Sequence, residues 1–168
     1  MLVLATTASA GNDKPIQVSQ LPQTAQQFIK KYFGDRKVAF AKEESDFRKS
    51  YEIAFKNGDK IEFDRKGEWT DIDCKYSAVP TGIIPAPIAK YVADNYPDNK
   101  IVQIERDTRS TEVKLDNRME IKFDKQHRVI GNGFFNLPQG KMPFPKFNPA
   151  LLTVSDFLAS AHNITLLP

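Results

Sequence analysis

The sequence runs through the same series of elements twice, and this internal repetition limits the folds available to the chain. Residues 21–38 match residues 84–101 at a constant spacing of 63 positions. Residues 51–64 then match residues 111–124 at a spacing of 60 positions. The spacing shortens by three residues in the segment between these matches, where a loop can lose residues without disturbing a fold. We therefore interpret the chain as two tandem copies of one structural unit.

Each copy is expected to begin with a helix. Pro22 and Pro85 stand where proline is tolerated in a first turn, and Gly34 and Pro97 mark the ends of the two helices. Between these limits, apolar side chains recur at helical spacing in both copies: Ala25, Phe28, Ile29 and Tyr32, and then Ile88, Tyr91, Val92 and Tyr96. Each predicted helix thus has one apolar stripe, which needs a surface to cover.

Strands with alternating apolar and polar side chains are predicted after each helix. Residues that oppose each other in an antiparallel ladder share a face, so we expect Phe55 opposite Ile61 and Leu115 opposite Ile121. A two-residue turn at Lys66–Gly67 would set the next pairs, namely Ile61 with Ile72, Phe63 with Thr70, and Asp64 with Trp69. This register places Cys74 with the core residues and leaves three side chains on the opposite, open face: Trp69, Asp71 and Asp73.

The predicted fold class is α+β, with two tandem units that each pack one helix on an antiparallel meander sheet of about four strands. The first unit spans residues 16–76 and the second spans residues 83–132. Residues 133–168 are expected to form a proline-rich tail, in which the pattern after Ser155 is compatible with a short capped helix. The tail is either a native extension that docks on the sheet or a segment foreign to the two units, and the sequence leaves both open.

The first ten residues have features of the remnant of a secretory signal peptide. Leu2–Ala5 is a short apolar stretch, and Ala8–Ala10 fits the small-x-small pattern of a cleavage site, so we expect the mature chain to begin at Gly11. No apolar run approaches the ~20 residues needed to cross a bilayer. We therefore expect a periplasmic or secreted protein.

Composition and the scarcity of reactive side chains argue against an enzyme or a nucleic-acid-binding protein. The net charge is only +3, and acidic and basic residues are interspersed. Cys74 is the single cysteine, so no internal disulfide can form, and His127 and His162 lack metal-ligand spacing. The sequence contains no nucleophile-and-base motif and no phosphate-binding glycine loop. We expect no catalytic activity, no cofactor and no transition-metal site.

The open face of the first unit carries the candidate binding residues: Trp69, Glu62, Asp64, Asp71 and Asp73. An outward Trp beside charged neighbours has the composition of an interface anchor, whereas a Trp that folds over the sheet edge would belong to the core. Clustered carboxylates can bind calcium or act as acid and base, but an ordinary hydrated sheet face has the same composition. The sequence keeps these alternatives open.

The ordered segments YEIAFKNGDKIEFDRKGEW, DIDCK, IIPAPIAKYVADNYPDNKI and EIKFDK resemble those of the PepSY-like periplasmic proteins, also described as beta-lactamase-inhibitor-protein-like. The resemblance covers residues 16–131 and implies a small exported bacterial protein built from two tandem helix-plus-sheet units. It also implies binding through the open sheet faces, because the better-known inhibitor of similar architecture grips its enzyme in that way.

We therefore expect a non-catalytic exported binding protein, with inhibition of a peptidase or hydrolase as its specific form. The expected partner is a periplasmic protein or peptide. The alternative is a structural or stress-related envelope protein that binds cell-wall material, metal or itself. The sequence does not predict the oligomeric state.

Overall fold

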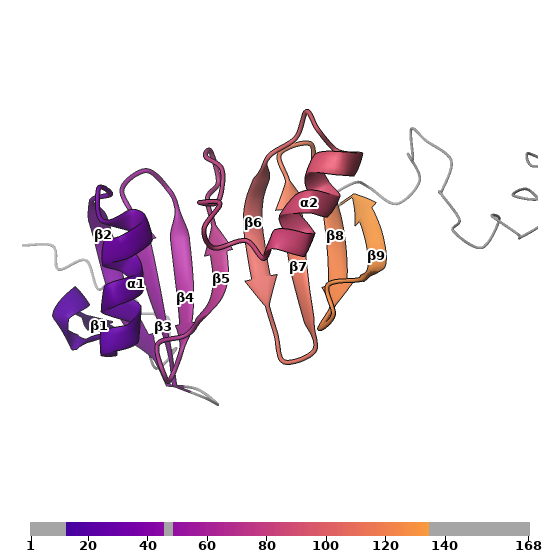
Figure 1. Cartoon of the computed structure of the whole chain (residues 1–168). Helices are drawn as coiled ribbons and strands as arrows, with labels where there is room; N and C mark the ends of the chain where they lie inside the picture. Colours follow the sequence, from indigo (N-terminus) through magenta and orange to yellow (C-terminus); the bar gives the residue numbers. More distant parts are fainter. Residues whose placement is uncertain (1–12, 46–48, 135–168) are drawn as a thin grey trace, which may run out of the picture. The chain divides into compact units, whose positions relative to one another are not determined.

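A computed structural model of the protein describes residues 13–45 and 49–134 (Figure 1). The strands in this part of the chain are β1 (Lys14–Ile16), β2 (Val38–Glu44), β3 (Ser50–Phe55), β4 (Lys60–Asp64), β5 (Trp69–Asp73), β6 (Ile101–Arg106), β7 (Ser110–Leu115), β8 (Met119–Asp124) and β9 (Val129–Phe134). The helices are α1 (Gln23–Phe33) and α2 (Ala86–Asn95), and a short 3₁₀ helix, η1 (Val18–Gln20), precedes α1. Each strand pairs with the next in chain order.

The expected arrangement of two separate helix-on-sheet units is wrong, because one nine-stranded antiparallel sheet runs through the described residues. The joint lies between β5 and β6, where three pairs form: Asp71 with Glu105, Ile72 with Ile104, and Asp73 with Gln103. A separate sheet ending at β5 would leave the outer backbone N–H and C=O groups of that strand unpaired. Pairing with β6 satisfies these groups, so both halves of the chain share one sheet.

The β3–β4 hairpin has the predicted faces but a register that differs by two residues. Ile53, rather than Phe55, pairs with Ile61, so Phe55 lies at the start of the turn. Gly58 takes the left-handed conformation, with a φ of 92°, that closes this turn. A shift of two residues preserves the side chains that face the core, because side chains alternate with a period of two.

The β7–β8 hairpin shows the same two-residue difference. Val113, rather than Leu115, pairs with Ile121. Its turn contains Arg118 with a φ of 70°, in the left-handed region that favours glycine. Both hairpins keep the predicted apolar side chains in the core, and four of them are 0 % exposed: Ile53, Phe63, Val113 and Phe123.

A β-bulge between β4 and β5 changes the face on which Trp69 lies. Ile61 pairs with Ile72 as predicted, but Phe63 pairs with Trp69 instead of Thr70. The bulge inserts one extra residue into β5, and this reverses the direction of the side chain that precedes it. Because paired residues share a face, Trp69 lies with Phe63 on the core side and packs against the core.

The core is a continuous row of apolar side chains that crosses the sheet on one face. Its members pair in order from β3 to β8 and are each 0 % exposed: Ile53, Ile61, Ile72, Ile104, Val113 and Ile121. Phe33 of α1 stacks on Phe55 with ring centroids 5.6 Å apart, and Tyr91 of α2 meets Phe123 edge-on at 5.6 Å. Both helices therefore pack on this face (Figure 1), and no helix of the described residues covers the opposite, open face.

Neither of the helices in the described part of the chain is long and apolar enough to cross a membrane. Residues 133 and 134, which the sequence assigns to the tail, belong to β9. The predicted signal-peptide remnant, residues 1–10, and the predicted helix after Ser155 lie outside the described residues.

Candidate functional site

Five carboxylates form a row across the open face, one on each of the five central strands. They pair in strand order from β3 to β7: Glu52, Glu62, Asp71, Glu105 and Glu112. Each of them is the sequence neighbour of a member of the apolar core row, so its side chain points to the opposite face of the sheet. These five residues are called the acidic row below.

Lysines lie at both ends of the acidic row. Lys42 of β2 pairs with Glu52, with its ammonium nitrogen 3.4 Å from the carboxylate, and Lys60 approaches the same carboxylate at 3.6 Å. At the other end, Lys122 of β8 pairs with Glu112 and approaches its carboxylate at 3.9 Å. Both end members are thus partly neutralised by neighbouring lysines.

Burial and mutual repulsion disturb the carboxyl groups at the centre of the acidic row. Burial raises the pKa of Glu62, and the charges of Asp71 and Glu52 raise it further. Burial also raises the pKa of Asp71. The hydrogen bond that Gln103 Nε2 donates to Asp71 Oδ1 at 2.8 Å lowers this pKa, whereas the charge of Glu105 raises it. Like charges on directly opposed strand residues destabilise a sheet, so the arrangement costs stability.

The structure separates the predicted acidic binding residues into two groups. Glu62 and Asp71 pair with each other within the acidic row, and Asp73 follows Asp71 on the same face. Asp64 is engaged in the turn after β4, where its Oδ1 accepts hydrogen bonds from two backbone N–H groups at 2.8 and 3.0 Å. The carboxylate of Asp64 thus stabilises its own turn.

Trp69 does not lie on the open face, where the register predicted from the sequence placed it. It is half-buried, packs against the core and shares its face with Phe63 because of the β-bulge. Arg106 covers its ring, with the guanidinium carbon 4.2 Å from the ring centroid. The same guanidinium donates from Nη2 to the carbonyl oxygen of Trp69 at 2.7 Å. These contacts place Trp69 at the margin of the core.

Sequence reasoning missed three members of the acidic row: Glu52, Glu105 and Glu112. Each occupies a polar position in an alternating strand, so the period alone could have assigned it to the open face. The alignment of all five residues could not be found in this way, because it depends on the pairing of β5 with β6.

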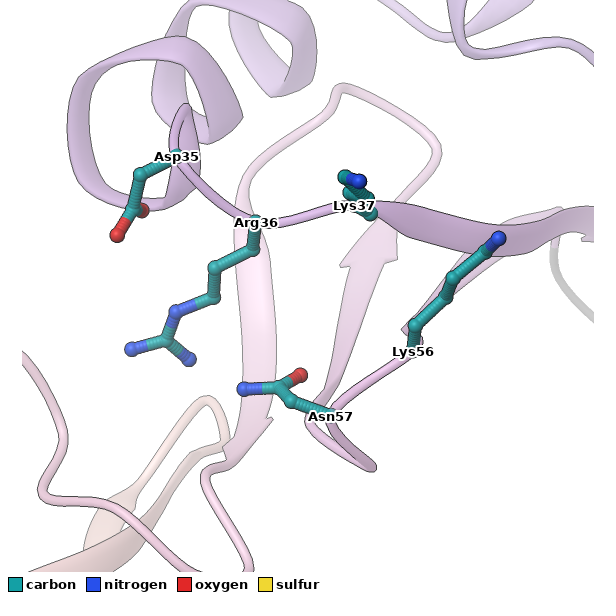
Figure 2. A pocket seen from close by; sticks show the side chains of 5 residues that line it. All are labelled: Asp35, Arg36, Lys37, Lys56 and Asn57. Atoms are coloured by element: carbon teal, nitrogen blue, oxygen red, sulfur yellow. The ribbon is translucent and has the colours of Figure 1, made fainter.

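A pocket of about 440 Å³ lies at the end of α1 and is lined by Asp35, Arg36, Lys37, Lys56 and Asn57. Figure 2 shows the side chains of Arg36 and Asn57 approaching each other from two segments. Both donate to Oδ2 of the buried Asp59, Arg36 in an ion pair and Asn57 from Nδ2 at 2.6 Å. Because Asp59 neutralises Arg36 and the walls carry both signs of charge, we assign no ligand to this pocket.

Cys74 has the environment of an unreactive thiol. It is 0 % exposed, and its sulfur lies 3.7 Å from Nη1 of Arg36. Burial raises the pKa of the thiol, while the charge of Arg36 acts in the opposite direction. Across residues 13–45 and 49–134, no group of three or more His, Cys, Asp or Glu side chains is arranged to hold a metal ion.

A profile of PepSY-like proteins, described as candidate beta-lactamase-inhibitor-like, matches residues 49–131. The crystal structure of a candidate calcium-regulated periplasmic protein from Bacteroides thetaiotaomicron is similar as well, with 60 % sequence identity and a TM-score of 0.71. The match covers 72 % of this chain and 96 % of that chain. The chain belongs to the PepSY-like family. The resemblance seen in the sequence is thereby confirmed.

This PepSY-like chain is also similar to two candidate periplasmic proteins from Bacteroides vulgatus. One is 60 % identical with a TM-score of 0.72, over 74 % of this chain and 99 % of that chain. The other, of unknown function, is 38 % identical with a TM-score of 0.69, over 72 % of this chain and 98 % of that chain. A comparison with curated proteins gives no match. The relatives confirm the predicted periplasmic location.

Proposed function

We propose that this PepSY-like protein is a non-catalytic binding protein of the periplasm, and that the open face of its sheet binds a basic surface of a partner protein. The acidic row carries this proposal, because it keeps like charges on neighbouring strands at a cost in stability. The inhibitor-like description of the family supports a protein as the partner.

A basic partner would relieve the repulsion within the acidic row. A lysine or arginine near Glu62 and Asp71 favours the charged carboxylates and lowers the pKa values that burial and neighbouring acids raise. The same field attracts a positively charged surface before contact, which speeds association and makes it sensitive to salt. Binding therefore adds positive charge to a row in which Lys114 already acts on Asp71 and lysines already pair with both end members.

Inhibition of a peptidase or other hydrolase is the specific form that we propose for this binding. The open face would cover the groove of the enzyme and exclude its substrate, so that no catalytic group of this chain takes part. This mechanism needs a rigid surface, and the buried apolar row beneath the open face supports the five strands that carry the carboxylates.

The proposal is tested by affinity capture from periplasmic extract with three forms of the full chain as bait. The first is the wild type, the second is E62Q/E105Q, and the third is the control E68Q/D98N. The control removes the same charge from two exposed positions outside the acidic row. We expect one set of proteins to be captured by the wild type and the control and lost with E62Q/E105Q.

The captured proteins are then purified and assayed for hydrolase activity with and without this protein. Inhibition is supported if the wild type lowers the hydrolase activity and E62Q/E105Q does not. Capture of the same proteins by all three baits contradicts the proposal, because binding would then not use the acidic row. Binding without any loss of activity contradicts the inhibitory form and leaves a binding protein.

Calcium is a second candidate occupant of the open face, since a relative with 60 % sequence identity is a candidate calcium-regulated protein. Carboxylate oxygens are the ligands that Ca²⁺ prefers in proteins. No described group of three carboxylates is arranged to hold an ion, so Ca²⁺ here would complete its shell with water. Calorimetric titration with CaCl₂ tests this candidate: heat of binding that E62Q/E105Q abolishes supports calcium, and no heat of binding rules calcium out at the acidic row.

A further inference from the structure

The two edges of the sheet differ in their protection against pairing with another strand. β1 (Lys14–Ile16) is three residues long and contains a lysine and a proline, two residues that block edge pairing. β9 (Val129–Phe134) is six residues long and contains neither a charged residue nor a proline. Ile130 is 59 % exposed, so β9 also presents an apolar side chain to solvent. β9 is therefore the edge that can accept a further strand.

Strand β5 is the counterpart of β9 in the first half of the chain, and its outer edge is paired with another strand. In the β4–β5 hairpin, a bulge follows the turn, and the next three residues, Asp71–Asp73, pair with β6. In the β8–β9 hairpin, a bulge lies at the corresponding place, and Gly131–Gly133 are the next three residues. These residues are exposed, and no described strand pairs with their outer side.

Strand β1 hinders a head-to-tail continuation of the sheet, because it covers three of the seven residues of β2. β9 of one copy could meet β2 of the next copy only outside Ala41–Glu43, the residues with which β1 pairs. A head-to-tail contact would also produce a ring or an open filament, whereas two β9 strands related by a two-fold axis form a closed dimer. A β9–β9 pair brings no like charges together, because the strand is uncharged.

We propose that β9 pairs antiparallel with β9 of a second copy and joins two sheets into one. A two-fold axis that relates antiparallel strands within one sheet is perpendicular to that sheet, so all four helices of the dimer lie on one side. The acidic rows of both copies then lie on the opposite face of the joined sheet. The dimer forms whether or not the open face binds a partner, but it would present two binding faces to one partner surface.

Residues 135–168 follow β9 directly and are the competing occupant of its edge. Four prolines between residues 138 and 149 have no backbone N–H to donate to a ladder, which disfavours this segment as a neighbouring strand. An interface limited to one strand pair is small, so we expect a dissociation constant in the micromolar range, of the order of 10 μM. The dimer should therefore dissociate on dilution.

The test uses sedimentation equilibrium of the full 19.0 kDa chain over a range of concentrations. The variant N132K/G133K adds two lysines to β9, where a Cβ at Gly133 meets no atom within 4 Å. The control Q27K/A93K adds the same charge to exposed positions on α1 and α2. We expect the wild type and the control to form dimers, and we expect the dissociation constant of N132K/G133K to be at least tenfold larger.

Amide hydrogen exchange locates the contact. Protection of β9 that increases with protein concentration, with no such change in β1, supports pairing between copies. A wild type that stays monomeric at every concentration overturns the proposal, as does a dimer that N132K/G133K leaves intact. Protection of the outward-facing amides of β9, those not bonded to β8, that is independent of concentration also overturns it, because the competing segment of the same chain would then occupy the edge.

Discussion

Replacement of Glu62 by Gln should stabilise the protein at neutral pH. Glu62 lies between two other carboxylates in the sheet ladder, Glu52 on β3 and Asp71 on β5. Directly opposed side chains have Cβ atoms about 5 Å apart, and two unit charges about 6 Å apart repel by about 0.7 kcal/mol in water. Glu62→Gln removes two such repulsions and keeps the shape of the side chain. We expect an increase of about 1 kcal/mol in the free energy of unfolding.

The stability gained by Glu62→Gln should decrease as the pH falls. The pKa of Glu62 is raised above its ordinary value of 4.5, so the folded protein takes up the proton more readily than the unfolded chain. The penalty from this carboxyl is therefore full above its folded pKa, decreases as the pH falls through that pKa, and is absent below 4.5. Urea unfolding of the wild type and E62Q between about pH 8 and pH 4 measures the difference.

Salt and a control variant complete the test. At an ionic strength of about 1 M the screening length is about 3 Å, so the gain from E62Q should become smaller. The control Asp98→Asn neutralises an exposed acid outside the acidic row and should change stability by less than about 0.5 kcal/mol at any pH. A variant E62Q that is less stable than the wild type at neutral pH, or a gain that neither acid nor salt reduces, would show that repulsion does not govern this row.

Four further predictions concern other parts of the structure. Gly67→Ala should lower the free energy of unfolding by about 2 kcal/mol, because φ of Gly67 is 81° and the new Cβ would lie 2.8 Å from Cβ of Pro22. Arg118→Gly should raise it by about 0.5 kcal/mol, because Arg118 has a left-handed φ of 70° that favours glycine. Urea unfolding measures both changes. Trp69→Ala should lower the free energy of unfolding by about 2 kcal/mol, because core packing and the contact with Arg106 are lost. An unchanged melting temperature would contradict this and favour a role of Trp69 in binding. Cys74 should react with iodoacetamide only after unfolding, and rapid alkylation of the folded protein would contradict its burial.

The assignment of side chains to the two faces could be predicted from the sequence, and its success has a simple physical cause. The expected pairing of Phe55 with Ile61 was wrong by two residues, yet both side chains lie in the core, at 3 % and 0 % exposed. Alternation has a period of two, so a register error of two residues cannot move a side chain to the other face. Turn conformations are harder to predict. Arg118, for example, has a left-handed φ of 70°, which an arginine rarely adopts.

The position of Trp69 could not be predicted by the same reasoning. A β-bulge adds one residue to β5, and an error of one residue moves a side chain to the opposite face. The alternation of Trp69, Asp71 and Asp73 therefore indicated a shared face that the structure does not have. The bulge depends on how β4 and β5 pair, and nothing in the local pattern of hydrophobicity marks it.

The pairing of β5 with β6 explains why the candidate site exceeds what either half of the chain could provide. A separate first sheet would offer Glu52, Glu62 and Asp71, and a separate second sheet would offer only Glu105 and Glu112. In the continuous sheet, Asp71 is directly opposite Glu105, so the two groups become one row whose charges reinforce each other. A surface that attracts a basic partner depends on this summed field. The long-range strand pair that the sequence did not predict is therefore the feature on which the proposed function rests.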